Sequence, residues 1–274
     1  MTNYLPLMEA AARSAGAAIL EVYAEDDFGV ETKGDDSPLT RADLAAHRII
    51  LAALEAGASD VPVLSEESTD VTYEERSTWE KYFLVDPLDG TKEFINRNGE
   101  FTVNIAYIEF GVPVQGVVYV PVKDVLYEGD QLNSTGARVT RDGQSEPIKA
   151  RVLESTSSLT IVASRRHGGD ALEKCLEVLR QHFDEIDTTN MGSSLKLCLV
   201  AEGKADLYPR LAPTSEWDTA AAQAVVEAAG GQVVDVSLNT LRYNAKEDIL
   251  NPFFYVISDP SFDWKRVLSQ VEIG

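Results

Sequence analysis

The sequence predicts an α/β fold, layered in α+β fashion from alternating helices and sheets. Segments with the 3.6-residue periodicity of helices interleave along the chain with short segments that alternate as strands do. Two strand-like segments, 102–109 and 112–120, flank Phe110-Gly111 and predict an antiparallel hairpin. At 274 residues, the chain has the length of one large domain or of two lobes.

The first lobe is predicted to span residues 1–150. It starts with an alanine-rich helix over residues 5–23, followed by a loop and a second helix from Thr40 to about Leu54. Strands are predicted at 62–64 and 82–85, and the hairpin comes next. Residues 130–146 are polar and contain glycine, so we expect loops and edge strands there.

The second lobe, residues 151–274, is predicted to mix short strands with amphipathic helices. The Trp217–Ala229 helix ends in two glycines, which favour a helix C-terminus. The predicted elements in chain order are a strand at 159–163, a helix at 170–183, a helix from Met191 to about Glu202, a strand and turn at 206–210, the helix at 217–229, strands at 233–236 and 253–258, and a helix at 260–271.

The composition narrows the range of partners. A net charge of −21 argues against non-specific binding to nucleic acid or to an acidic membrane surface. An anionic substrate then requires metal ions that reverse the local field. The spacing of Cys175 and Cys198 fits neither a disulfide nor a zinc site, so both are expected to be reduced core thiols. We expect a cytoplasmic protein, with peripheral association at the inner membrane face left open.

The stretch from Phe83 to Phe94 organises the predicted chemistry. A buried strand is expected to stop at Asp86-Pro87, and Gly90 then allows a tight turn into a short helix beginning at Thr91. Asp86 and Asp89 thus lie at a strand end, where their oxygens suit hard divalent cations. The alternative is an ordinary turn, because Asp-Pro and Asp-Gly are common turn dipeptides.

Other acidic residues have two interpretations each. Asp43 lies three residues after Thr40 and can be the partner in a capping box. His47 follows one turn later and is more often structural than a ligand. Glu66 and Glu67 follow a short strand, whose end can meet that of the Asp86 strand. Asp218 starts a helix, where a lone aspartate commonly acts as a cap.

In combination, these motifs resemble the inositol monophosphatase superfamily. The two superfamily signatures are matched by DPLDGT at 86–91 and by WDTAAA with EAAGG at 217–231. The likeness is closer to one branch, the CysQ-type 3'(2'),5'-bisphosphate nucleotidases, and extends over nearly the whole chain. The segments that carry it are SPLTRAD at 37–43, VLSEE at 63–67, KEFINRNGEFTVNI at 92–105 and GSSLKLCLVAEG at 192–203.

The resemblance implies a site with two or three Mg²⁺ ions. Glu66, Asp86 and the Leu88 carbonyl would hold the first ion. The second would bind Asp86, Asp89 and Asp218, and Glu67 would help with a third. The resemblance also implies that the Gly90 and Thr91 amides cradle the scissile phosphate. Thr91, backed by Asp43, would activate the attacking water.

The branch resemblance further implies a place for a second phosphate. Ser193, Lys196 and Arg210 would hold the phosphate that is not cleaved, and Ser164 and His167 would lie near the nucleotide. The alternative interpretation is that Lys196 and Arg210 are ordinary exposed charges on the protein surface and bind no ligand.

The implied activity is Mg²⁺-dependent hydrolysis of adenosine 3',5'-bisphosphate to AMP and phosphate, with its 5'-phosphosulfate form as a related substrate and with sensitivity to lithium. The alternatives are an inositol or sugar monophosphatase on the same metal site and a non-catalytic ligand sensor. The sensor would be expected to lack a metal ligand or Thr91, and this chain has them all.

Overall fold

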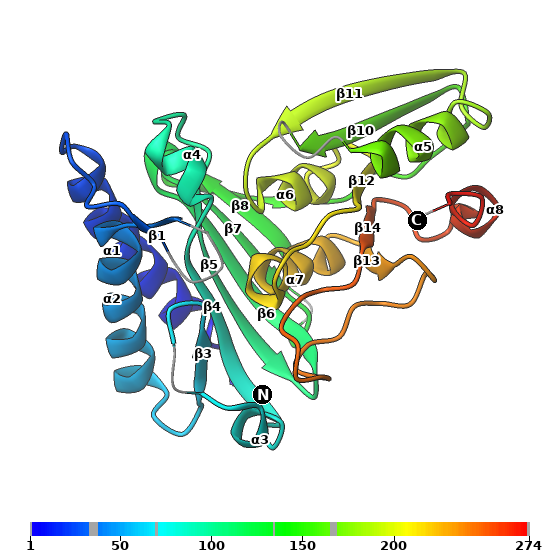
Figure 1. Ribbon diagram of the computed structural model, residues 1–274. Helices are drawn as coiled ribbons and strands as arrows, with labels where there is room; N and C mark the ends of the chain where they lie inside the picture. Colours follow the sequence, from blue (N-terminus) through cyan, green and yellow to red (C-terminus); the bar gives the residue numbers. More distant parts are fainter. Residues whose placement is uncertain (1, 33–37, 69–70, 134, 165–168, 273–274) are drawn as a thin grey trace.

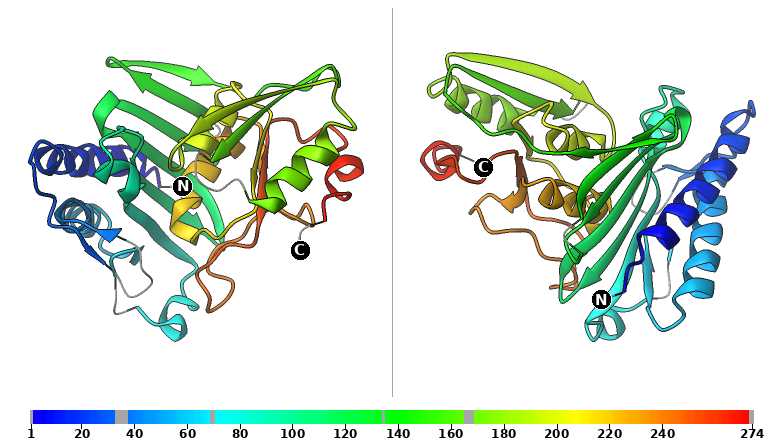
Figure 2. Two further views of the ribbon diagram at one scale, coloured as in Figure 1. Left: turned by 45° about the horizontal axis from the view of Figure 1, so that its top comes forward. Right: turned by 180° about the vertical axis from the view of Figure 1, so that it is seen from behind.

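Two β-sheets alternate with three layers of helices (Figures 1 and 2). The computed structural model describes residues 2–32, 38–68, 71–133, 135–164 and 169–272. One layer of helices covers the outer face of the first sheet, a second layer lies between the sheets, and a third covers the far face of the second sheet. The predicted layered α/β class is therefore confirmed.

The first sheet has seven strands in the sequence order β3-β4-β5-β6-β7-β8-β9. Neighbouring strands are antiparallel except for β3 and β4, which are parallel. The elements up to the end of this sheet are α1 (Leu5–Tyr23), β1 (Glu31–Thr32), β2 (Pro38–Leu39), α2 (Arg41–Gly57), β3 (Val63–Ser65), α3 (Tyr73–Arg76), β4 (Lys81–Asp89), α4 (Thr91–Ile95), β5 (Thr102–Glu109), β6 (Val112–Val120), η1 (Pro121–Lys123), β7 (Val125–Asp130), β8 (Gly136–Arg141) and β9 (Gln144–Ile148).

The second sheet has five strands in the order β11-β10-β12-β14-β13, with β10 parallel to both of its neighbours. Its elements are β10 (Ser158–Ser164), α5 (Asp170–Leu179), β11 (Glu185–Met191), α6 (Leu195–Ala201), β12 (Leu207–Arg210), η2 (Glu216–Asp218), α7 (Ala220–Ala228), β13 (Gln232–Asp235), β14 (Phe254–Ile257) and α8 (Trp264–Leu268). One apolar core cluster contacts both sheets, and the division into lobes near residue 150 stays a prediction.

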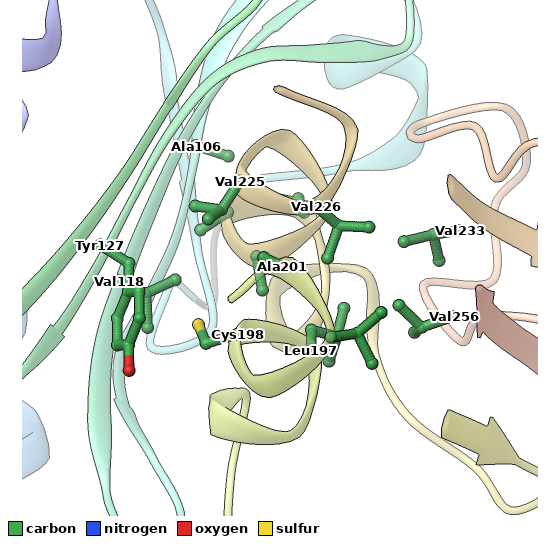
Figure 3. Close-up of a cluster of buried hydrophobic side chains, with 14 of the residues drawn as sticks. Ala106, Val118, Tyr127, Leu197, Cys198, Ala201, Val225, Val226, Val233 and Val256 are labelled. Carbon is green, nitrogen blue, oxygen red and sulfur yellow. The ribbon is translucent and has the colours of Figure 1, made fainter. Parts of the chain in front are cut away.

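Helices α6 and α7 fill the space between the sheets (Figure 3). Tyr127 and Val118 approach them from the first sheet, and Val233 and Val256 approach from the second. On the outer side of the first sheet, α1 and α2 bury a stripe of alanine, isoleucine and leucine against β4, β5 and β6. Helices α5 and α8 pack in the same way on the far face of the second sheet. No helix within the described ranges is long and apolar enough to cross a membrane.

Helix α7 lies unusually close to strands β6 and β7. A Cβ atom on Gly116 would lie 2.3 Å from the Ala221 carbonyl oxygen, and one on Gly129 would lie 2.4 Å from that of Ala224. Such distances are shorter than any normal van der Waals contact, and the obstacles are backbone atoms that cannot rotate away. Both positions must therefore be glycine for α7 to lie against the sheet.

Several predicted elements are confirmed. Helix α1, the β5–β6 hairpin and the short helix at Thr91 lie where the sequence predicts them. The ends of β3 and β4 meet as expected, because Ser65 pairs with Val85. Cys175 and Cys198 are both buried free thiols.

Other predictions in the first sheet are wrong. Strand β4 does not stop at Asp86 but continues to Asp89, with a register shift between these two residues. Such an irregularity is where a proline such as Pro87 can be accommodated in a strand. Residues 125–148 form three strands in place of the loops that we expected. Strand β8 alternates between buried and half-buried residues, and β9, which is almost entirely exposed, is the edge strand.

The second half also differs in detail. Helix α5 ends at Leu179, α8 spans only Trp264–Leu268, and α7 begins at Ala220 because a short 3₁₀ turn precedes it. Strand β11 was not predicted from the sequence. Its residues are mostly polar and half or fully exposed at a sheet edge, so it lacks the apolar alternation by which strands are found.

Gly129→Ala should lower the free energy of unfolding by about 1–3 kcal/mol, the usual cost of overpacking a dense core. The added methyl group can only be accommodated if α7 moves away from β7. Urea denaturation followed by circular dichroism measures the change. Unchanged stability would show that α7 does not lie as close to the sheet as described.

Candidate active site

Three aspartates from two distant parts of the chain converge at the end of β4. Asp86, Asp89 and Asp218 each offer a carboxylate oxygen, and these oxygens lie within 4.8 Å of one another. Asp86 is buried, while Asp89 and Asp218 are half-buried. The first two come from the irregular end of β4 and the third from the 3₁₀ turn η2, so the sites singled out at 86–91 and 217–231 meet in space.

Local structure holds each carboxylate in place. The Leu88 amide donates to Asp86 Oδ1 at 3.0 Å, which stabilises the bend between Asp86 and Asp89. Asp218 Oδ2 accepts from the Ser215 amide at 2.9 Å within a capping box. The capping interpretation of Asp218 is therefore correct, and its second oxygen can still serve as a ligand.

The turn that carries Asp218 is itself fixed from behind. The side-chain amide of Asn251 donates to the Ser215 carbonyl at 2.7 Å and to Thr219 Oγ1 at 3.0 Å. Trp217 packs against the central core cluster. The turn is thus attached on both sides of Asp218.

Burial and mutual repulsion raise the pKa values of all three acids. Burial and the Asp89 charge raise the pKa of Asp218 to about 8. The pKa of Asp89 rises to about 6 through burial, although the Lys196 ammonium and the Ser194 amide act in the opposite direction. The pKa of Asp86 lies well above its usual range because of burial and the charges of Glu66, Asp89 and Asp218. An oxygen-only donor set with this much repulsion fits a hard divalent cation.

Glu66 adjoins this cluster, and Glu67 lies beside His47. Glu66 forms a side-chain hydrogen bond with Asp86 and raises its pKa further. Its backbone amide donates to the Val85 carbonyl at 3.0 Å, which places it at the adjacent strand end. His47 Nδ1 lies 2.9 Å from Ser65 Oγ, and burial lowers the pKa of His47 although the Glu67 charge raises it. The structural interpretation of His47 is the one that this contact supports.

Asp43 satisfies both of its interpretations at once. Its Oδ2 accepts from the Thr40 amide at 2.8 Å, which completes the capping box of α2. Its Oδ1 accepts from the Thr91 hydroxyl at 3.3 Å. One carboxylate therefore closes a helix and contacts the hydroxyl at the start of α4.

Gly90 makes the turn between Asp89 and α4. It has φ +92°, a left-handed conformation that side chains rarely adopt, and a Cβ atom there would lie 3.2 Å from the Glu100 carbonyl oxygen. The turn leaves the Gly90 and Thr91 amides at the start of the short helix. The Thr91 hydroxyl also lies 3.5 Å from the Leu88 carbonyl oxygen.

A cavity of ≈ 140 Å³, called the Lys196 cavity below, adjoins the carboxylates, and its wall includes Lys92 as well as Asp89, Glu93 and Asp218. Lys196 and Arg210 line it, together with Ser193. Lys196 is only 8% exposed, which excludes the surface-charge interpretation for this residue. Its ammonium donates to the Ser193 carbonyl at 2.6 Å and lies 5.6 Å from the centre of the Tyr208 ring. Burial lowers the pKa of Lys196 to about 8, against the opposing effect of Asp89.

A second cavity of ≈ 360 Å³ adjoins the same carboxylates and includes Glu66 and Thr91 in its wall. Asp89 and Asp218 line both cavities, so the acidic cluster lies between the Thr91 side and the Lys196 side. Arg210 Nε and Ser193 Oγ are buried and have no hydrogen-bond partner within the described part of the chain. A ligand with its own acceptors can satisfy both.

Two residues that were predicted to lie near the nucleotide are only partly described. Ser164 is the last residue of β10, and His167 falls outside the described residues. Ser194 and Thr102 were given no role from the sequence. In the structure, the Ser194 amide and the Thr102 hydroxyl both donate hydrogen bonds to Asp89. Thr102 and Asn104 are polar residues in an otherwise apolar strand, and that departure from the pattern was the available signal.

The layered fold and the acidic strand end together define a protein class. Residues 2–259 match the model of the inositol monophosphatase family, and the chain belongs to this family.

The relatives of this chain include bisphosphate nucleotidases. The 3'(2'),5'-bisphosphate nucleotidase CysQ of Salmonella typhimurium is 48% identical over 246 residues, which are 89% of this chain and 96% of that protein. The crystal structure of CysQ from Bacteroides thetaiotaomicron has 43% identity and a TM-score of 0.82, covering 93% of this chain and 97% of that one. An inositol monophosphatase from Anabaena, at 24% identity and a TM-score of 0.72, shares the fold over 98% of this chain and 96% of its own.

Without metal, stability should fall as pH rises from about 4 to about 8. In this window the folded protein keeps protons on Asp89 and Asp218, with pKa values of about 6 and about 8, while the unfolded chain has lost them. Urea denaturation in EDTA at several pH values measures the slope. Asp218→Asn, which cannot titrate, is the matched control and should show a shallower slope. Equal slopes would contradict the pKa assignment.

Proposed function

We propose that this chain is a Mg²⁺-dependent 3'(2'),5'-bisphosphate nucleotidase that converts adenosine 3',5'-bisphosphate to AMP and phosphate. The observation that carries the proposal is the placement of the acidic cluster between two cavities, one containing Thr91 and the other Lys196 and Arg210. A substrate with two phosphates has one anion for each side. The CysQ relatives support the same activity.

The carboxylates supply the ligands of two or three Mg²⁺ ions. Glu66, Asp86 and the Leu88 carbonyl would hold one ion, and Asp86, Asp89 and Asp218 would hold another, with Glu67 assisting a third. When bound, the ions supply positive charge to the attacking and leaving oxygens of phosphoryl transfer. They also offset the repulsion among acids whose pKa values are raised.

Thr91 and Asp43 orient and deprotonate the attacking water. The Thr91 oxygen accepts a proton from water as its own hydroxyl proton passes toward Asp43 Oδ1, which lies 3.3 Å away. A threonine hydroxyl is too weak a base to act alone and needs this carboxylate. The amides of Gly90 and Thr91 donate to the scissile phosphate at the start of α4.

Lys196, Arg210 and Ser193 bind the phosphate that stays on the product. The two cations give a charge-assisted site, and the buried Arg210 Nε and Ser193 Oγ each gain a partner. Ser164 and His167 are proposed to lie near the nucleoside. The alternative, an inositol or sugar monophosphatase, is favoured by the family match, but it leaves the buried Lys196 without an anionic ligand.

Asp89→Asn should abolish turnover while leaving the fold intact. The substitution removes a charged ligand shared by both cavities, and the amide keeps the same size. Phosphate release at saturating Mg²⁺ measures turnover, and circular dichroism measures the fold. Asp142→Asn, at an exposed turn, is the matched control and should retain full activity. Near-normal activity of Asp89→Asn would remove this residue from the metal site.

Lys196→Ala should weaken hydrolysis of adenosine 3',5'-bisphosphate by about 1.5–3 kcal/mol, the usual contribution of a hydrogen bond to a charged group. This corresponds to roughly tenfold or more in kcat/KM. Slow hydrolysis of inositol monophosphate should barely change, because this substrate has no second phosphate. The measurement is phosphate release from both substrates.

The ratio of the two losses cancels any general damage to the fold or the metal site. Lys174→Ala, an exposed lysine of α5, is the control and should leave both rates unchanged. Equal losses on the two substrates would make Lys196 structural. A wild-type preference for inositol monophosphate would overturn the nucleotidase proposal in favour of the alternative.

A further inference from the structure

A single peptide group joins Asp89 of the acidic cluster to Lys196. The Ser193 carbonyl accepts from the Lys196 ammonium at 2.6 Å, and the Ser194 amide donates to Asp89 Oδ2 at 2.5 Å. These are the two ends of one trans peptide, so they point in opposite directions. Lys196 and Asp89 are therefore connected through one rigid, polarisable group.

The side chain of Ser194 holds this peptide in place. Its hydroxyl lies 2.8 Å from Thr102 Oγ1 and donates to Asn104 Oδ1 at 2.9 Å. Thr102 in turn donates to Asp89 Oδ2 at 3.5 Å. All three polar residues are at most 2% exposed, and Asn104 Nδ2 has no partner within the described ranges. Buried networks of this kind have few alternative arrangements.

The backbone at this point is also strained. Ser193 has φ +46°, which is unfavourable for a residue with a side chain and persists only where the surroundings enforce it. Here the enforcing contacts are those to Lys196 and Asp89, on either side of the peptide. A change at either contact thus alters the other.

We propose that the Ser193–Ser194 peptide, braced by Ser194 and Thr102, couples the two halves of the site, so that an anion at Lys196 strengthens divalent metal binding at the carboxylates. Ser194 and Thr102 are then positioning residues. The inference rests on the proposed function, because it takes the acids as a metal site and Lys196 as an anion site.

The sign of the coupling follows from charge. A cation among the carboxylates is repelled by the Lys196 ammonium, whose charge already affects Asp89. An anion on Lys196 cancels this repulsion and competes for the ammonium protons now given to the Ser193 carbonyl. Metal and anion must therefore each raise the affinity of the other by the same factor.

Direct electrostatic attraction between the ligands would give some coupling without the peptide. The bracing residues distinguish the two sources, because removing a hydroxyl from Thr102 leaves every charge in place. Thr102 also contacts Asp89 Oδ2, so its loss can change the affinity for metal itself, but the factor by which an anion changes that affinity is sensitive to the oriented peptide.

The test is calorimetric titration of the full chain with Mg²⁺, with and without saturating sulfate as the anion probe. In the wild type, sulfate should lower the Kd for Mg²⁺ about fivefold or more, within the usual range of coupling between sites. Thr102→Val keeps the shape of the side chain but loses the hydroxyl. In this variant, sulfate should lower the Kd for Mg²⁺ by less than about twofold. Thr102→Ser, which retains the hydroxyl, is the matched control and should keep the wild-type factor.

Two further variants complete the design. Lys196→Met keeps the length of the side chain and should abolish the sulfate effect, which shows where sulfate acts. If Thr102→Val does not fold, Ser194→Ala removes the other hydroxyl that holds the peptide in place. The sulfate effect on the Kd for Mg²⁺ should then fall in the same way. The inference is overturned if the folded Thr102→Val or Ser194→Ala protein keeps the wild-type factor, or if wild type binds both ligands independently. Failure of wild type to bind Mg²⁺ at all would overturn the proposed function as well.

Discussion

The crowding of carboxylates at the end of β4, where they lose solvent and repel one another, is the constraint on which the rest of the site depends. Asp86, Asp89 and Asp218 offer oxygens within 4.8 Å of one another, and the pKa of each is raised. Such a cluster is unfavourable until a cation or protons occupy it. The scaffold must therefore supply the energy that holds the acids together, and it does so through dense packing and attached turns.

The layers distribute that task. The end of β4 presents two of the acids, and its neighbour β5 supplies Thr102 behind Asp89. Helix α7 lies so close to β6 and β7 that only glycine fits at Gly116 and Gly129. This close packing fixes the start of α7, and with it the turn η2 that carries Asp218 just before the helix. The Ser193–Ser194 peptide then joins Asp89 to Lys196 on the second sheet's side. The same contacts that stabilise the interface between the sheets thus orient the groups that bind substrate.

The sequence predicted the layered class, the long first helix, the hairpin and the acids at 86–89 and 218, because periodicity and turn residues are local signals. Strand β11 was missed because its exposed residues lack the apolar alternation of a half-buried strand. The capping box of Asp43 was predicted from local residues and its pairing with Thr91 from the resemblance, but only the structure shows that one carboxylate makes both contacts at once. Ser194 was also beyond sequence reasoning, because its contact with Asp89 is made by a backbone amide.

The central claim is that the proposed metal site and the pair of cations Lys196 and Arg210 together select a substrate with two phosphates. The most direct measurement compares kcat/KM of the wild-type protein for adenosine 3',5'-bisphosphate and for adenosine 3'-monophosphate. Both substrates have the same reacting phosphate, and only the second phosphate differs. We predict a preference of roughly tenfold or more for the bisphosphate, from charge-assisted bonds to Lys196 and Arg210. Equal values for the two substrates would contradict the account.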